Sequence, residues 1–219
     1  MFVITADQID SRNDRDRATE MIASLTADFG PAFPLPPDQT SGDEIQVMTT
    51  DASAALDVVL ALHRSGYWST GLGIGEVNTP LPDSTRQSSG GAFVAARNAV
   101  TRSKRTEARF ALECAAAHPG GPDARELTGD EVEALVTMLL LLRQRRTSEG
   151  WEAVELLRSG LSQVKIAAAL GISTAAVSQR VKIAQWRVEE AVRPALVRLL
   201  QNLDRATTDR ATTETEPAA

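Results

Sequence analysis

The stretch of residues 160–182 places the strongest constraint on the fold. Its sequence is GLSQVKIAAALGISTAAVSQRVK, which predicts two short helices joined by a tight turn. Two helices can cross steeply only where a small residue lies at their contact, the turn tolerates positive φ, and an apolar residue fills the angle between them. Ala167, Gly171 and Val177 meet these three requirements in order. We therefore predict a helix-turn-helix at residues 161–186.

Apolar residues at helical spacing define the inward side of this stretch. They are Val164, Ile166, Leu170, Ile172, Val177 and Val181. Ser173 or Thr174 follows the turn and is a suitable N-cap for the second helix, since a hydroxyl oxygen there can accept a backbone N–H bond.

The outward side of the second helix carries small and hydrogen-bonding residues, as a helix that enters the DNA major groove requires. We therefore predict an interface with double-stranded DNA that consists of Ser173, Thr174, Ala175, Ser178, Gln179, Arg180 and Lys182. Gln179 can pair with adenine, and Ala175 can contact a thymine methyl group. Arg180 and Lys182 can reach phosphate or guanine. The alternative is an αα-hairpin used only for packing.

Charge is distributed unevenly along the chain. The formal net charge is −6, but residues 1–149 contain 14 Lys and Arg against 21 Asp and Glu, whereas residues 150–205 contain 8 against 5. The positive charge thus coincides with the predicted helix-turn-helix. This distribution is typical of a regulator with a DNA-binding module on an acidic domain, and not of a non-specific DNA coat.

Composition limits the possible domain number and cellular location of the protein. The chain has 219 residues, of which 42% are hydrophobic, and this length suits two small domains. A single cysteine, Cys114, excludes an internal disulfide. Neither a signal peptide nor an apolar run of membrane-spanning length is evident. These features predict a cytoplasmic protein that does not associate with a membrane.

The first half of the chain predicts elements in the order of a ferredoxin-like palm. We expect strands at residues 2–6, 45–49, 70–77 and 108–112, and helices at residues 14–29, 52–65 and 92–103. Glycines in the strand at 70–77 indicate that another backbone comes close to it. The predicted class is α+β, with a ferredoxin-like palm domain followed by an all-α helix-turn-helix domain.

Proline and glycine mark the boundary between these domains at residues 118–125. We divide the chain into a palm-like domain at 1–117, a linker at 118–127, a helical domain at 128–205 and a disordered tail at 206–219. The helix at 132–146 is apolar around more than one face, which predicts burial either between the domains or against its copy in a homodimer. The half-site geometry of helix-turn-helix proteins favours the homodimer.

Three motifs in the palm resemble those of class III nucleotide cyclases and GGDEF diguanylate cyclases. They are Ala6-Asp7 after the first strand, Gly42-Asp43-Glu44 on the hairpin, and Gly91-Ala-Phe-Val-Ala-Ala-Arg97 on the later helix. With the Gly-Ile-Gly-Glu strand at 73–76 and the helix-turn-helix, the whole chain is similar to the SatD family of small bacterial proteins. This resemblance covers about residues 1–185.

The resemblance implies a ligand site in the palm. In cyclases, the positions of Asp7 and Asp43 hold two divalent cations that bridge a nucleoside triphosphate, because carboxylates suit hard, oxygen-loving ions. Arg97 matches the arginine that stabilises charge on the transferred phosphate. The implied site holds Mg²⁺ through Asp7, Asp43 and Glu44, and a nucleotide through Arg97 and Gly42.

One departure from the cyclase motif favours binding without catalysis. Phe93 stands where the cyclase helix carries an asparagine. We therefore expect no enzymatic activity, and predict a sequence-specific transcriptional regulator whose palm binds a nucleotide or a divalent metal. The alternatives are acidic residues that only cap turns, a nucleotidyl cyclase with an accessory helix-turn-helix, and an interaction scaffold whose helical domain contacts RNA polymerase.

A basic run at residues 101–109 lies at the end of the palm. It is either a solvated surface or a contact for a nucleic-acid backbone. The solvated surface is the simpler interpretation, because charged residues on a helix need no further function.

Overall fold

The computed structural model describes residues 1–40, 42–115 and 127–214. The chain divides into two compact units. One consists of Met1–Thr137 with Val197–Ala219, and the other of Met138–Leu196. We call them the palm unit and the helical unit, and the boundary between them falls within helix α4 and within helix α8.

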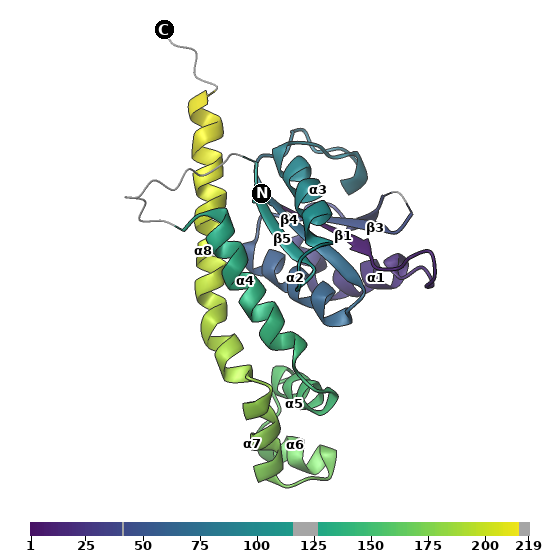
Figure 1. Ribbon diagram of the computed structural model, residues 1–219, viewed down its shortest axis with the longest axis vertical. Helices are drawn as coiled ribbons and strands as arrows, with labels where there is room; N and C mark the ends of the chain where they lie inside the picture. The colour runs from purple at the N-terminus through teal and green to yellow at the C-terminus, as the bar shows by residue number, and fades with distance from the viewer. Residues whose placement is uncertain (41, 116–126, 215–219) are drawn as a thin grey trace. The chain divides into compact units, whose positions relative to one another are not determined.

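The palm unit is built on a five-stranded mixed sheet with the order β2-β3-β1-β4-β5 (Figure 1). The strands are β1 (Phe2–Gln8), β2 (Asp38–Gln39), β3 (Glu44–Thr49), β4 (Trp68–Ile74) and β5 (Phe110–Cys114). Strand β1 is antiparallel to both β3 and β4, β2 is antiparallel to β3, and β5 is parallel to β4. The first four strands have the ferredoxin-like order, so the predicted fold class is confirmed.

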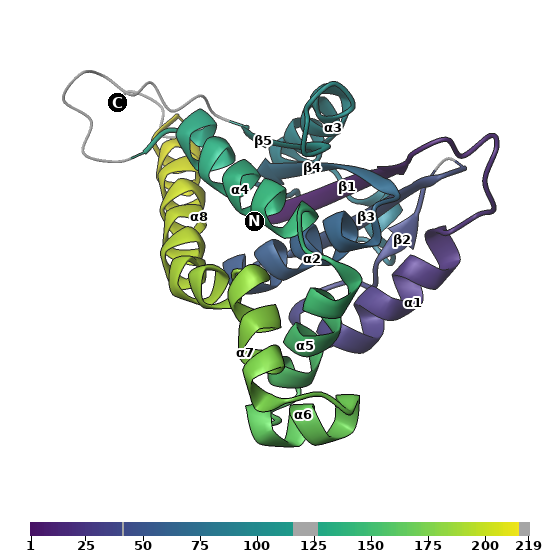
Figure 2. The ribbon, with the colours of Figure 1, turned by 60° about the horizontal axis from the view of Figure 1, so that its bottom comes forward.

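Helices cover both faces of this sheet (Figure 2). Helices α1 (Ala18–Phe29) and α2 (Ala52–Ser65) lie on one face, and α3 (Gly91–Ser103) lies on the other. Short 3₁₀ turns occupy Gly30–Ala32 and Thr85–Gln87. The Asp51 side chain caps α2, and Gly66 ends that helix at φ 78°. Both roles are the usual ones for these residue types.

Two glycines of β4 let α3 lie directly on the sheet. A Cβ at Gly71 would lie 2.2 Å from the backbone nitrogen of Val100, and a Cβ at Gly73 would lie 2.2 Å from the carbonyl oxygen of Ala92. No side chain fits at such distances, so only glycine permits this approach. The predicted close approach of a second backbone is confirmed.

The helical unit consists of helices, three of which are short and share a small core. They are α5 (Ser148–Arg158), α6 (Gln163–Leu170) and α7 (Thr174–Ile183), with parts of α4 (Gly129–Gln144) and α8 (Trp186–Glu214). The core of α5, α6 and α7 is formed by Ala153, Ile166, Ala167, Val177 and Val181. These helices lie together in Figure 1.

Besides shifts of a few residues in the bounds of helices and strands, two details differ from the sequence predictions. Helix α8 continues to Glu214, so residues 206–214 are helical where the sequence predicts a disordered tail. Leu203 and Thr207 are buried, so packed positions of the helix continue past residue 206. Val164, predicted to point inward, is 69% exposed because it lies about 200° around α6 from the buried Ile166. The predicted linker, apart from Leu127, and the last five residues lie outside the described residues.

Candidate functional site

The turn between α6 and α7 has the geometry of a helix-turn-helix. Gly171 ends α6 in the left-handed conformation at φ 64°, and its N–H donates to the carbonyl of Ala167. Ser173 caps α7, since its hydroxyl accepts a bond from the N–H of Ala176 at 3.1 Å. The sequence therefore identifies both the glycine that makes the turn and the residue that starts the second helix.

Helix α7 is anchored through one side. Val177 is 0% exposed and Val181 is 4% exposed, and both belong to the small core. The opposite side carries the exposed residues Thr174, Ala175, Ser178, Gln179 and Lys182. Five of the seven predicted DNA-contacting residues thus share one open surface.

The other two predicted DNA contacts have structural partners. The Ser173 hydroxyl is used by the N-cap bond. The Arg180 guanidinium forms an ion pair with Glu152 of α5 at 3.0 Å and is directed toward that helix. Both residues contribute to holding α7 in place.

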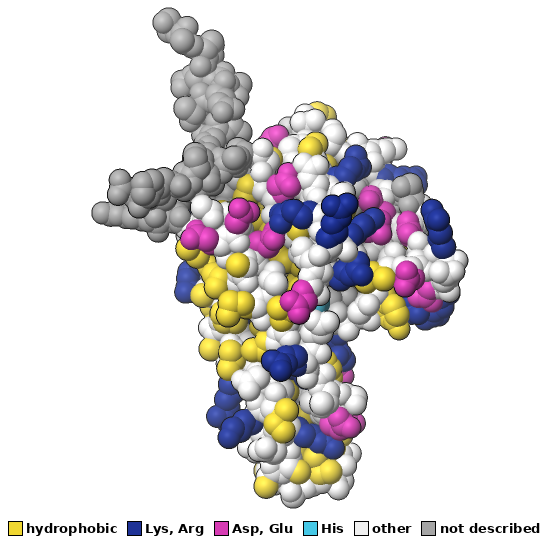
Figure 3. Space-filling view, in the orientation of Figure 1, with side chains coloured by type: hydrophobic (Ala, Val, Ile, Leu, Met, Phe, Trp, Pro, Cys, Tyr) yellow, Lys and Arg dark blue, Asp and Glu magenta, His cyan; other side chains and the backbone are white. Residues whose placement is uncertain are grey.

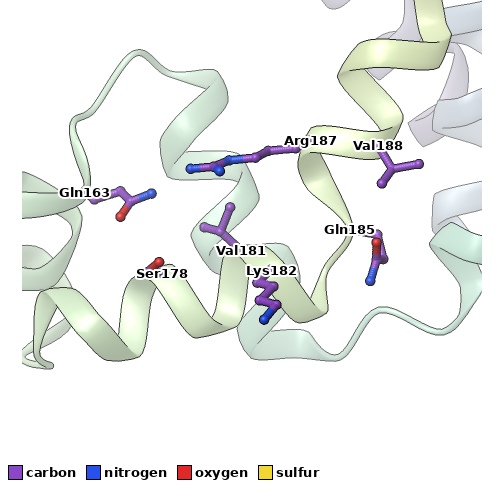
Figure 4. Close-up of a pocket in the computed structure, with 7 residues that line it drawn as sticks. All are labelled: Gln163, Ser178, Val181, Lys182, Gln185, Arg187 and Val188. Carbon is purple, nitrogen blue, oxygen red and sulfur yellow. The ribbon is translucent and has the colours of Figure 1, made fainter.

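A groove of about 340 Å³ adjoins α7 (Figure 4). It is lined by Gln163, Ser178, Val181, Lys182, Gln185, Arg187 and Val188. The Gln163 amide and the Arg187 guanidinium extend toward each other in Figure 4. The groove therefore joins side chains from α6, α7 and the start of α8.

Sequence reasoning missed Gln163, Gln185 and Arg187. A left-handed residue, Gln185 at φ 53°, separates α7 from α8. Neither glycine nor proline marks this break. In one continuous helix, Val181 and Trp186 would lie on different sides, because they are five residues apart. This mismatch is the only sequence signal for the break between α7 and α8.

A buried charge cluster supports the helical unit. The Glu189 carboxylate is 1% exposed and accepts from Arg143, from Arg146 at 2.8 Å and from Arg158 at 2.7 Å. The Arg146 and Arg143 guanidinium carbons also lie 4.3 Å and 4.9 Å from the centre of the Trp151 ring. This arrangement joins residues of α4, α5 and α8 to the segment between α4 and α5.

Burial and charge act in opposite directions in this cluster. Burial disfavours the Glu189 carboxylate, but the surrounding arginines, Arg143 foremost, outweigh it and lower its pKa. Burial lowers the pKa of Arg143 to about 10, although Glu189 opposes that change. Both groups are therefore ionised at neutral pH.

The structure brings the acidic residues of the palm motif to one end of the sheet. Asp7 of β1 lies opposite Glu44 of β3, and the N–H of Gln8 donates to the carbonyl of Asp43 at 3.1 Å. The Asp7 carboxylate pairs with the Lys104 ammonium at 2.7 Å. Among the described residues, no group of three or more His, Cys, Asp or Glu side chains is gathered to hold a metal ion.

The other motif residues of the palm are divided between a hollow at this end of the sheet and helix α3. Gly42, at φ 72°, and Asp43 line a shallow hollow of about 460 Å³ with Gln8, Ser11, Arg12 and Asp16. Arg97 is exposed on α3 and does not line this hollow. Phe93 is 7% exposed and packs against Val3 and Met48. That position belongs to the core, and the predicted ligand site stays a prediction.

The basic run at residues 101–109, which begins in the last turn of α3, is partly neutralised. Lys and Arg side chains gather over this part of the palm unit in Figure 3. Arg102 pairs with Glu133 at 2.8 Å, which raises its pKa, and Lys104 pairs with Asp7. One Arg109 nitrogen donates to the Lys104 carbonyl at 2.9 Å. These contacts agree with the simpler interpretation of a solvated surface.

Comparisons with protein-family models, curated proteins and solved structures found no match to this chain. The resemblance to the SatD family and to the cyclases therefore stays a prediction. Among residues 1–40, 42–115 and 127–214, no helix is long and apolar enough to cross a membrane.

Proposed function

We propose that the protein is a sequence-specific DNA-binding regulator of transcription. The observation that carries this proposal is the division of α7 into two sides. Val177 and Val181 anchor one side, while Ala175, Ser178 and Gln179 are exposed on the other. A helix held in this way presents side chains of the size and chemistry that base edges require.

The exposed residues of α7 divide into two roles under this proposal. Gln179 has the amide needed for paired hydrogen bonds with adenine, and Ala175 can contact a thymine methyl group. Lys182 supplies a positive charge one turn further along and can contact phosphate. Such a division predicts base selection by Ala175 and Gln179 and sequence-independent attraction by Lys182.

A homodimer is part of this proposal. Met138 is 67% exposed and Leu135 is 37% exposed, although both are large apolar residues of α4. Exposed apolar side chains one turn apart on a helix favour contact with another apolar surface. A second copy of the chain would supply that surface together with a second recognition helix, as palindromic half-sites require.

The test is genome-wide chromatin enrichment of the tagged protein. We expect discrete peaks that share a motif, and we expect a Gln179→Ala, Lys182→Ala variant to lose them. A Gln144→Ala, Arg145→Ala variant is the matched control, because it likewise removes one amide and one cationic side chain from exposed positions of the helical unit outside α7. Peaks that survive the first variant, or no peaks in the wild type, would contradict the proposal.

A further inference from the structure

The lining of the groove beside α7 fits an anion. Lys182 and Arg187 contribute positive charge, and Gln163, Ser178 and Gln185 contribute hydrogen-bond donors. None of the described residues that line the groove is acidic. Such a combination of cations and neutral donors is typical of contacts with phosphate.

The groove adjoins the exposed side of α7. Ser178 and Lys182 belong both to the exposed side of α7 and to the groove lining. A ligand that lies along α7 therefore continues into the groove. In a duplex whose major groove holds a helix, the neighbouring part of the ligand is the sugar–phosphate backbone.

Two elements outside α7 aim donors at this position. Gln163 is the first residue of α6, and the start of a helix carries partial positive charge from its free N–H groups. Arg187 lies in the first turn of α8, where the left-handed Gln185 has redirected the chain. Figure 4 shows the two side chains converging above Ser178 and Val181.

We infer that this groove binds a phosphodiester of the DNA backbone, with Arg187 as the cationic ligand and Gln163 and Ser178 as hydrogen-bond donors. The inference rests on the proposed function. It assigns sequence-independent affinity to Arg187, whereas Gln179 supplies the choice of base. An acidic peptide segment would fit similar donors, and if that were the ligand, Arg187→Ala would leave the affinity for DNA and its salt slope unchanged.

The experiment measures affinity against salt concentration for the full chain. The probes are a duplex that carries the motif enriched on chromatin and a scrambled duplex of equal length. For Arg187→Ala, we expect affinity for both duplexes to fall by the same factor. The slope of log affinity against log salt should decrease by about 0.9, the value for one lost phosphate contact. Arg187→Lys should keep the wild-type slope.

Two further variants make the result decisive. Gln163→Glu should weaken binding to both duplexes, while an acidic residue at the start of α6 keeps the helix stable. Arg145→Ala removes the same charge from outside the groove and should leave the slope unchanged. If Arg187→Ala keeps the wild-type slope while the wild type still selects its motif, the inference is wrong and the proposed function stands. If the wild type binds neither duplex, the proposed function itself fails.

Discussion

The palm unit and the helical unit are stabilised by different interactions. In the palm unit, large apolar side chains such as Ile4, Leu72 and Phe110 are fully buried between sheet and helices. In the helical unit, the small core of α5, α6 and α7 is accompanied by the buried ion cluster around Glu189. Small units bury a lower fraction of their surface, so paired charges occupy space that a larger domain fills with apolar groups.

The same difference separates the ion pairs of the two units. Glu189 and Arg146 are 1% and 0% exposed, whereas Lys104 and Asp7 in the palm unit are 47% and 24% exposed. Water screens the second pair but not the first. Removing one partner should therefore lower the free energy of unfolding more in the buried Glu189 cluster than in the partly exposed pair of Lys104 and Asp7.

Loss of the central carboxylate should have the largest effect. Glu189→Ala leaves three arginines without their shared partner, and breaking a buried pair costs about 3–5 kcal/mol. We expect this loss in the free energy of unfolding, measured by urea titration with circular dichroism. Glu190→Ala is the matched control, because its neighbouring carboxylate is exposed. Equal unfolding free energies for the two variants would show that the cluster does not stabilise the helical unit.

A methyl group added between β4 and α3 should destabilise the palm unit, but by less than the loss of Glu189 destabilises the helical unit. Gly73→Ala places a Cβ 2.2 Å from the Ala92 carbonyl oxygen, so α3 must move. Overpacking of this kind costs about 1–3 kcal/mol. Gly30→Ala is the control, since its nearest contact would be 3.7 Å from the Thr26 methyl group. Faster hydrogen exchange in α3 for Gly73→Ala alone would agree with this account, and unchanged exchange would contradict it.

Acid should affect the helical unit through Glu189. The folded-state pKa of this carboxyl is below its ordinary value of 4.5. Its contribution is therefore fully present above that value and is lost as the pH falls toward the folded-state pKa. We expect hydrogen exchange in α5 and α8 to accelerate as the pH falls below 4.5, after correction for the intrinsic exchange rate. Glu189→Gln should remove this pH dependence, and its persistence in that variant would assign it to another group.

Removal of the Asp7 charge should have the smallest effect on stability. Asp7→Asn replaces one partner of a half-exposed ion pair, and such pairs contribute about 0–1 kcal/mol. The same variant tests the predicted ligand site. Calorimetric titration of the wild type with Mg²⁺ and a nucleoside triphosphate should show binding that Asp7→Asn lacks. Absence of binding in the wild type would contradict the predicted ligand site. The Asp7 side chain would then serve only its ion pair with Lys104.

Local steric requirements made the helix-turn-helix predictable. Gly171, Val177 and Ser173 act through their immediate neighbours, so their spacing in sequence determines their positions in space. The order of the palm elements follows in the same way from hydrophobic periodicity and turn residues. The glycines of β4 also indicate their own role, because a strand rarely uses them without a close neighbour.

Long-range contacts were not predictable from the sequence. Glu189 meets Arg143 and Arg146 across more than 40 positions, and no pattern in a single sequence pairs a given carboxylate with a given arginine. The groove depends on the left-handed Gln185, a residue type that usually continues a helix. Spacing alone also cannot show that Asp7 has Lys104 as a partner.

The ion cluster around Glu189 has a consequence for heating. Hydration of charged groups becomes less favourable as temperature rises, so the cost of burying an ion pair falls. Apolar burial instead gives a large heat capacity of unfolding and a strongly curved dependence of stability on temperature. We therefore expect the helical unit, with its few buried apolar residues, to have a flatter stability curve than the palm unit. Cooling and warming should then change the palm unit more than the helical unit.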